Sequence, residues 1–293
     1  MKWQFIFLLV GLVILVALII SRIKVQIVCF TLERTLPISD GKMKRISIII
    51  VAVCGLLAMA GATDYRIQIA EVNNQIIVIT NRVQIMDGYT TLLVHFDGAH
   101  AVSNYTAETG QKLTFVSNAR LTTSTKQFGT ACLTCDTKGD YVTVPATSDW
   151  DFGSGDFTIE CWVRSDLITS EDGVFSFITD VTNRINLAVY SSSFYAEVYS
   201  DGSIFTGTFG DTIIQYAWYH VAVVRNSNTL TWYVGGASKL TNDVSGKSFD
   251  LSGTTPFIGQ YSAHSLYGEI DEFRVSKGIA RWTANFTPLT HPY

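Results

Sequence analysis

Short runs of β-branched and aromatic residues recur along the chain from Thr91 onward, separated by clusters of Gly, Asp, Asn and Ser. No stretch of helical length in this part repeats with a 3.6-residue period. Short strands with turn signals about every 8–12 residues are typical of a β-sandwich or barrel rather than of alternating strands and helices. The pattern predicts strands at residues 92–96, 141–144, 157–164, 175–179, 186–190, 194–199, 218–225, 230–234, 255–258 and 268–275.

The clearest local signal is a hairpin around residues 226–228, flanked by the runs WYHVAVVR and TLTWYVGG. Because strand side chains alternate between two faces, Ala222 and Val224 share one face of the first run, while Val221 and Val223 share the other. Both faces are therefore largely apolar, which predicts a strand covered on both sides in a two-sheet sandwich.

Two uncharged apolar runs precede this region, at residues 3–20 and 46–62. At 1.5 Å per residue, each is close to the length needed to cross a bilayer as a helix. The basic residues Arg22, Lys24, Arg34, Lys42, Lys44 and Arg45 lie between the runs. Basic segments stay on the cytoplasmic side, so a helical hairpin anchor would place everything after Ala62 outside the membrane.

The second run has another interpretation. Met43, Lys44 and Arg45 precede about a dozen apolar residues and an Ala58-Met59-Ala60 site, which is the pattern of a secretory signal peptide with Met43 as the initiator. Both interpretations make residues 1–62 an anchor or a leader, and both predict a membrane-anchored or secreted protein whose remainder lies outside the cytoplasm. Cys54 does not fit a lipoprotein site, because Val53 precedes it.

Residues 63–90 form a segment of their own between the apolar runs and the regular pattern. Apolar positions alternate at Ile67 and Ile69 and again at Ile77 and Ile79, which fits a two-stranded linker or assembly arm as well as an amphipathic helix.

Composition narrows the function classes. The 293 residues are 47% hydrophobic and carry a net charge of −4, with no basic cluster after residue 62. This excludes the electrostatic signature of a nucleic-acid binder. Five cysteines are too few for a disulfide scaffold in a chain of this length.

Several ordered motifs resemble one known family. They are LLVHFDG at 92–98, FGTA at 128–131, GDYVTVP at 139–145, DFGSGDFTIECWV at 151–163, WYHVA at 218–222 and GEIDEFRV at 268–275. Together they resemble the laminin G-like, concanavalin A-like jelly roll found in phage tail and secreted bacterial proteins, over residues 91–293. The resemblance implies an all-β, two-sheet antiparallel jelly-roll sandwich preceded by the N-terminal hydrophobic helical segments, and it fits a short helix at residues 277–282.

The sequence departs from this family pattern at three places. Gly235-Gly236 replaces the usual Asp in a turn, and Cys135 and Cys161 stand where core aromatics are usual. This superfamily includes lectins, adhesion modules, glycanases and inert structural domains, so the resemblance is specific for fold rather than for activity.

A glycanase of this fold needs two carboxylates aligned on one strand. Glu269 and Asp271 begin such a pattern, but Phe273 and Arg274 stand where the next acid is required, and Glu272 points to the other face. We therefore predict that the protein is not an enzyme.

Asp97 and Asp271 lie in motifs where members of the superfamily hold a calcium ion, and hard cations bind such oxygen ligands. The alternative is that Asp97 caps the Asp-Gly turn while Asp271 accepts hydrogen bonds from backbone amides. Cys132-x-x-Cys135 has no second pair, so two small buried side chains are favoured over zinc or redox chemistry, with a bridge to Cys161 as a further alternative.

Trp218, Trp232, Tyr261 and Tyr267 are candidate platforms on which sugar rings stack. The favoured function is thus a binding module outside the cytoplasm for a glycan or surface polymer, with calcium as a candidate cofactor. Two alternatives are a structural subunit of a virion or surface filament, which would form homo-oligomers through residues 63–90, and, more weakly, a glycoside hydrolase.

Overall fold

The computed structural model describes residues 27–37, 43–53, 68–72, 75–79, 87–168 and 171–293 of the chain. The chain divides into two compact units, Met1–Gly88 and Tyr89–Tyr293.

The described part of the first unit consists of two antiparallel strand pairs. β1 (Ile27–Pro37) pairs with β2 (Met43–Val53), and β3 (Gln68–Val72) pairs with β4 (Gln75–Ile79). The helix predicted for residues 46–62 is not confirmed, since residues 46–53 belong to β2. Ile and Val dominate this run, and such β-branched residues favour strands, while an apolar run alone does not distinguish strand from helix.

The predicted apolar run at residues 3–20, residues 54–62 and Cys54 lie outside the described residues. Within the described ranges, no helix is both long and apolar enough to cross a membrane.

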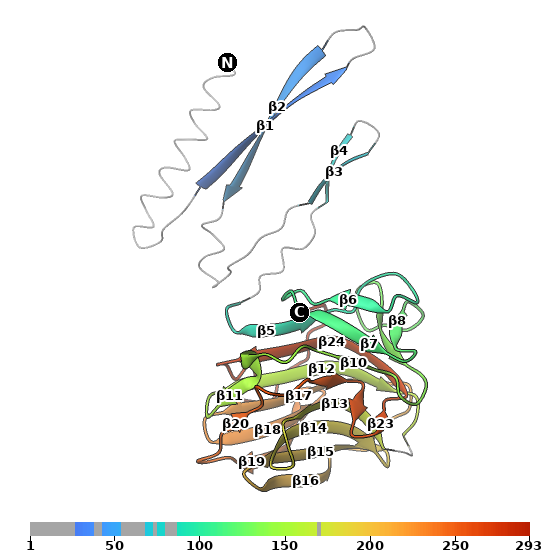
Figure 1. Ribbon diagram of the computed structural model, residues 1–293, viewed down its shortest axis with the longest axis vertical. Coiled ribbons are helices and arrows are strands. Elements are labelled where there is room, and N and C mark those ends of the chain that lie inside the picture. Colours follow the sequence, from blue (N-terminus) through green and yellow to red (C-terminus); the bar gives the residue numbers. More distant parts are fainter. Residues whose placement is uncertain (1–26, 38–42, 54–67, 73–74, 80–86, 169–170) are drawn as a thin grey trace. The chain divides into compact units, whose positions relative to one another are not determined.

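The second unit contains two antiparallel eight-stranded sheets (Figure 1). Sheet I has, in spatial order, β16 (Ser203–Phe209), β15 (Ser193–Ser200), β14 (Asn183–Tyr190), β13 (Asp172–Ile178), β21 (Phe257–Ile258), β10 (Tyr141–Thr143), β7 (Lys112–Val116) and β6 (Asn104–Thr106). Sheet II has β19 (Ala237–Asp243), β18 (Thr229–Val234), β17 (Trp218–Asn226), β12 (Phe157–Ser165), β24 (Gly268–Lys277), β9 (Cys132–Cys135) and β8 (Arg120–Thr122), with β5 (Thr90–Val94) beside β24.

Two small strand pairs, β11 (Asp151–Gly153) with β20 (Phe249–Asp250) and β22 (Gln260–Tyr261) with β23 (His264–Ser265), and the 3-10 helix η2 (Ser148–Trp150) complete the unit. Every strand predicted after residue 90 overlaps an observed one, so the all-β sandwich is confirmed. The helix predicted at residues 277–282 is wrong. β24 runs to Lys277, and Gly278 then turns the chain at a φ of +85°.

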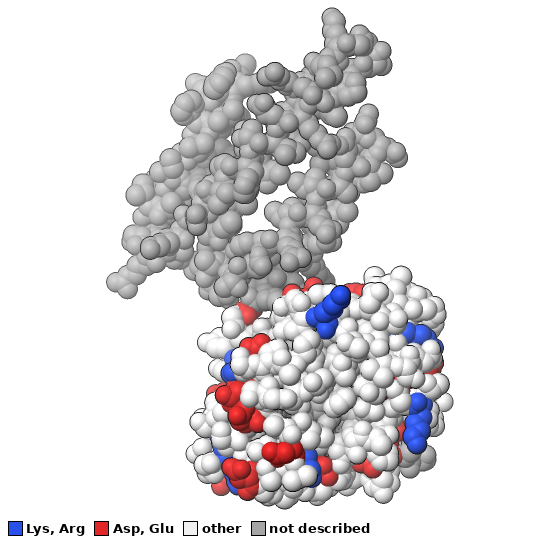
Figure 2. Space-filling model, viewed as in Figure 1, with Lys and Arg blue, Asp and Glu red and all other residues white. Residues whose placement is uncertain are grey.

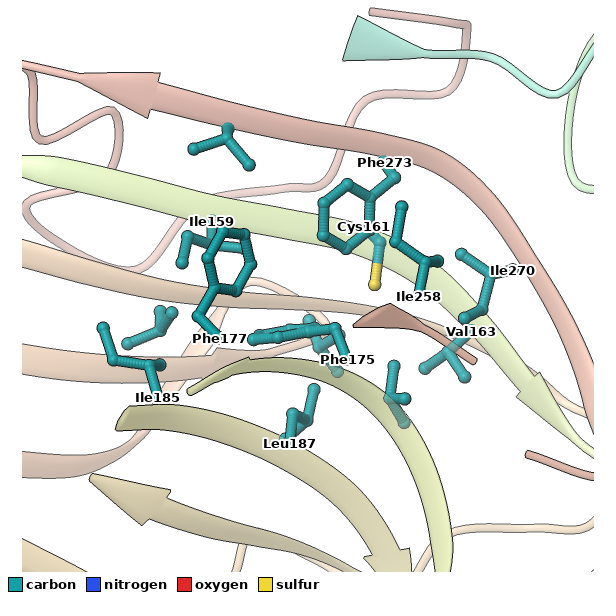
Figure 3. Packing of buried hydrophobic residues seen from close by; sticks show 14 of the residues in the cluster. Ile159, Cys161, Val163, Phe175, Phe177, Ile185, Leu187, Ile258, Ile270 and Phe273 are labelled. Carbon is teal, nitrogen blue, oxygen red and sulfur yellow. The ribbon is translucent and has the colours of Figure 1, made fainter. Parts of the chain in front are cut away.

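The inward faces of the two sheets form one aromatic-rich core (Figure 3). Phe175 of sheet I meets Trp232 and Phe273 of sheet II, with ring centroids 6.4 and 5.8 Å apart. Cys161, which stands where the family pattern has an aromatic, is fully buried in this core near Phe273.

The outward face of sheet II is covered by the chain after β24. Ala222, Val224 and Tyr233 form a second small apolar cluster, against which Trp282 and Phe286 pack. This confirms that both faces of β17 are covered, and the predicted hairpin closes through Ser227 at a φ of +55°.

Gly236 is required for this covering. Its φ is +80°, and an added Cβ would lie 1.9 Å from the Phe286 carbonyl oxygen, while the Phe286 N–H donates to the Gly236 carbonyl at 2.9 Å. At Gly236, therefore, the C-terminal segment comes too close for any side chain.

The segment after β24 also covers a buried charged residue, Glu160. Glu160 is fully buried, and it accepts hydrogen bonds from Arg274 Nε at 2.8 Å and from Trp282 Nε1 at 2.7 Å, with His220 Nε2 3.3 Å away. Burial alone would raise the pKa of Glu160, but the Arg274 guanidinium and His220 outweigh it and lower the pKa to about 2.

Truncating Phe175 to alanine should destabilise the unit, because the cavity would open between three buried aromatic rings. We expect F175A to lower the free energy of unfolding by about 3–5 kcal/mol. Urea denaturation followed by tryptophan fluorescence measures this, with V181A as the control, since Val181 is 76% exposed. Equal stability of F175A and V181A would contradict the described core.

Glu160→Gln should be costly at neutral pH, because it removes the buried negative charge that pairs with Arg274 and His220. Breaking a buried ion pair costs about 3–5 kcal/mol. The folded-state pKa of about 2 lies below the ordinary 4.5, so this stabilisation is present above pH 4.5 and is lost as the pH falls toward 2.

The difference between the wild type and E160Q in urea denaturation should therefore shrink below pH 4.5. D211N is the control, because the Asp211–Lys239 pair is on the surface and should not change the stability measurably. A difference that does not vary with pH would contradict the assigned role of the Glu160 charge.

Candidate functional site

The outward face of sheet I carries a group of tyrosines, here called the tyrosine face: Tyr190, Tyr195, Tyr199 and Tyr261. It follows from strict alternation in β15, where Phe194, Ala196 and Val198 are buried and the residues between them are partly exposed. Figure 2 shows the unit with a largely uncharged surface and with acidic residues gathered toward one margin.

Three of these rings form a continuous row. The Tyr190 and Tyr195 centroids are 6.1 Å apart with an interplanar angle of 61°, and those of Tyr195 and Tyr261 are 6.2 Å apart at 46°. Tyr190 is 44% exposed at the end of the row. The rings support one another by edge contacts, so their positions are fixed before any ligand arrives.

Glu197 points outward between Tyr195 and Tyr199 on β15 and accepts hydrogen bonds on this face. Its Oε1 accepts from the Tyr195 hydroxyl at 3.2 Å, its Oε2 accepts from Asn186 Nδ2 at 3.4 Å, and its Oε2 is 3.1 Å from Arg184 Nε. Burial and the Glu197 charge raise the pKa of Tyr195 to about 12 and raise that of Tyr261 further. Both hydroxyls therefore remain protonated at physiological pH.

Arg184 completes the group from the neighbouring strand. It lies opposite Tyr199 in the β14–β15 register, and its guanidinium carbon is 3.9 Å from the centre of the Tyr199 ring. The positive charge of Arg184 thus has two partners on this face, the Glu197 carboxylate and the Tyr199 ring.

Gly173 permits Tyr261 to reach the row. The β22–β23 hairpin crosses β13 at this glycine, where an added Cβ would lie 1.9 Å from the Tyr261 nitrogen. Hydrogen bonds from Gly259 N to Val174 O and from Leu266 N to Gly259 O, both 2.8 Å, fix the hairpin at its base.

The four aromatic residues predicted to stack on sugars lie at different places in the structure. The prediction for Trp232 is wrong, because the residue is fully buried in the core, where it contacts Phe175 and Phe209. Only Tyr261 lies on the tyrosine face. Trp218 and Tyr267 are partly exposed and belong to the region of sheet II. Trp218 lies opposite Arg164 in the β12–β17 register, and the Tyr267 carbonyl accepts a hydrogen bond from Asp166 N at 2.7 Å.

Both predicted calcium ligands bind backbone amides of the same loop. Asp97 Oδ1 accepts from Thr130 N and, at 3.3 Å, from Ala131 N, while Asp271 Oδ2 accepts from Gln127 N at 2.9 Å and Phe128 N at 3.0 Å. The residues that the structure describes contain no cluster of three His, Cys, Asp or Glu suited to a metal ion. The geometry is that of loop anchoring, and calcium stays a prediction.

Glu269, the first acid of the hydrolase pattern, is held in an ion triad. Glu269 Oε2 contacts Arg164 Nη1, which also lies 2.7 Å from Asp166 Oδ1, and Glu269 Oε1 accepts from Thr125 at 3.0 Å. The single Arg164 guanidinium thus pairs with both carboxylates and leaves the triad with one net negative charge. Cys132, Cys135 and Cys161 are free and buried, so the bridge considered for Cys161 is absent.

Sequence reasoning missed Tyr190, Tyr195, Tyr199, Arg184 and Glu197. The run SFYAEVYS contained the signal, since Tyr, Glu and Tyr alternate in it with Phe, Ala and Val. What the sequence did not supply was the neighbour of each position, which depends on register with β14 and on the distant β22–β23 hairpin.

Comparison with solved structures supports the fold. Domain 4 of AbnA, a GH43 extracellular arabinanase from Geobacillus stearothermophilus in complex with arabinotriose, matches with a TM-score of 0.53 and 15% identity, over 66% of this chain and 94% of that one. The binding domain of Paraclostridial Mosquitocidal Protein 1 matches with a TM-score of 0.52 and 12% identity, over 65% of this chain and 49% of that one.

The ligand-binding domain of botulinum neurotoxin serotype D in complex with N-acetylneuraminic acid also matches, with a TM-score of 0.50 and 13% identity, over 66% of this chain and 48% of that one. This chain thus spans most of the arabinanase domain but about half of each toxin chain. At these identities the likeness shows a shared fold.

No curated protein matches the chain. The model of the concanavalin A-like lectin/glucanases superfamily matches residues 136–281, which contain most of both sheets and the whole tyrosine face. Over these residues, the chain is similar to the concanavalin A-like lectin/glucanases superfamily, in its laminin G-like form.

Proposed function

We propose that the second unit is a non-catalytic module that binds a glycan on the tyrosine face. The observation that carries this proposal is the row of Tyr190, Tyr195 and Tyr261, partly exposed and held in place by each other and by Glu197. Such rings offer flat apolar surfaces to the C–H faces of sugars, and their hydroxyls offer hydrogen bonds at the edges.

Preorganisation makes this face suitable for binding. Tyrosine has few rotatable bonds, and here each ring is already restrained by a neighbour, so little conformational entropy is lost when a ligand is bound. The matching arabinanase and toxin domains carry arabinotriose and N-acetylneuraminic acid, which supports a carbohydrate as the partner.

The ion triad of Arg164, Asp166 and Glu269 fits a module that binds a glycan without cleaving it. A retaining or inverting mechanism needs a free carboxylate beside a second one. Arg164 lies between Glu269 and Asp166 instead, and we propose that these acids hold the end of sheet II rather than act on a glycosidic bond.

We also propose that the module acts outside the cytoplasm. Support comes from the apolar runs at residues 3–20 and 46–62 and the basic residues between them. N-terminal sequencing of the mature protein distinguishes an anchor from a cleaved leader. An intact N-terminus on a cytosolic protein would contradict both forms of the proposal.

Y195A and Y261A should each weaken glycan binding at least about tenfold, because Y195A removes the central ring of the row and Y261A removes the ring beside it, and aromatic anchors of this kind commonly contribute most of the binding energy. A glycan array finds the ligand, and titration calorimetry on the best hit measures the affinity. The same titration with EDTA tests whether calcium takes part.

Y216A is the matched control, since Tyr216 is a tyrosine that is 56% exposed and stacks on Arg164 away from the tyrosine face. It should bind as the wild type does. Wild-type binding by Y195A and Y261A, or release of reducing sugar from the bound glycan, would refute the proposal.

A further inference from the structure

We infer that the glycan site continues across sheet I from the tyrosine face to a second aromatic pair, Tyr141 and Phe257, so that its ligand is an oligosaccharide chain rather than a single terminal sugar. This inference rests on the proposed function and specifies the size class of its ligand. The register of sheet I, the position of the two rings and the side chains between them and the tyrosine face support it.

The register places the second pair on the same face of sheet I as the tyrosines. One line of directly opposite residues crosses all eight strands, from Thr206 on β16 through Glu197, Asn186, Ser176, Phe257, Thr143 and Thr114 to Asn104 on β6. Directly opposite residues of antiparallel strands share one face of a sheet. Since Glu197 is on the outward side of β15, Phe257 is on the outward side of β21, and its neighbour Ile258 is fully buried in the core.

The two rings of the second pair are partly exposed and contact each other. Tyr141 lies on β10, where the next residue, Val142, is fully buried in the core. The Tyr141 and Phe257 ring centroids are 5.4 Å apart with an interplanar angle of 68°. Each ring therefore restrains the other before a ligand arrives, as in the tyrosine row.

Tyr261 extends the tyrosine row toward this pair. Its backbone lies against Gly173 of β13, while its ring centroid is 6.2 Å from that of Tyr195 on β15. Phe257 is on β21, the strand beside β13, and lies opposite Ser176. Ser176 is about 10 Å along β13 from Gly173, and neighbouring strands are about 4.8 Å apart. One sugar ring is too small to cover both aromatic groups, whereas a chain of several sugars can contact both.

The side chains between the two aromatic groups on this line are small, polar and engaged with one another. Ser176 and Asn186 are both buried. The Ser176 hydroxyl donates to Asn186 Oδ1 at 2.9 Å, and Asn186 Nδ2 donates to Glu197 Oε2 at 3.4 Å. A chain that passes from Tyr261 to Phe257 therefore meets neither side chain as an obstacle.

Beyond Phe257 the line continues with two threonines. Thr143 is partly exposed and Thr114 is exposed, on β10 and β7. A threonine hydroxyl can both donate and accept a hydrogen bond, as sugar hydroxyls do. The far end of the site thus offers rings and hydroxyls side by side, which is the composition that a sugar chain requires.

The test uses the full chain and a size series of the glycan that the array identifies, from its smallest bound member upward. For the wild type, the affinity should rise with chain length until the chain reaches Phe257. F257A and Y141A should each weaken the longest members at least about tenfold, because each removes an aromatic anchor, and leave the smallest bound member nearly unchanged. Y195A should weaken every member of the series.

Y216A is again the control, because Tyr216 is an exposed tyrosine outside both aromatic groups, and it should match the wild type at every length. Urea denaturation verifies that the variants are folded, and Phe257→Leu, which keeps apolar bulk without a ring, replaces F257A if that variant unfolds.

Wild-type affinity of the Phe257 and Tyr141 variants for the longest members, with Y195A weakened, would overturn this inference and leave the proposed function standing. An affinity that does not change with chain length would have the same consequence. Absence of binding to every glycan would overturn both.

Discussion

The packing of sheet I against sheet II determines which side chains of the two sheets point outward to the surface of the second unit. Phe175, Trp232 and Phe273 join the sheets through ring contacts, and the inward residues of β14 and β15 fill the space beside them. Because strand side chains alternate, fixing Val198 inward also fixes Glu197 and Tyr199 outward. The core and the tyrosine face are thus two consequences of one register, and a slip by one residue would destroy both.

The two sheets differ in what covers their outward faces. Sheet II is closed by the segment after β24, whose Trp282 and Phe286 lie on Ala222, Val224 and Tyr233. Beneath this segment, Glu160 and Arg274 form a buried pair that is stable because each charge has a partner and further hydrogen bonds. The outward side of sheet I carries partly exposed tyrosines instead, and this asymmetry decides which face can meet a ligand.

Particular residues show how far sequence reasoning reaches. The strands after residue 90 and the hairpin at Ser227 were predictable, because alternation and turn residues are local signals. The run at residues 46–62 was predicted as a helix and lies in β2 as far as Val53, since Ile and Val in an apolar run satisfy both patterns. Trp232 was mistaken for a surface platform, because an aromatic in a strand gives no indication of which face it occupies until the partner sheet is known.

The sequence by itself determined the sandwich and its approximate strands, because these depend on composition and on periodicity within short windows. Only the tertiary structure decided which aromatics are neighbours. Tyr195 and Tyr261 are brought together by the crossing of the β22–β23 hairpin over Gly173, and Glu269 and Asp166 are brought together by Arg164. Contacts between residues so far apart depend on backbone register and on close approach, which no local pattern encodes.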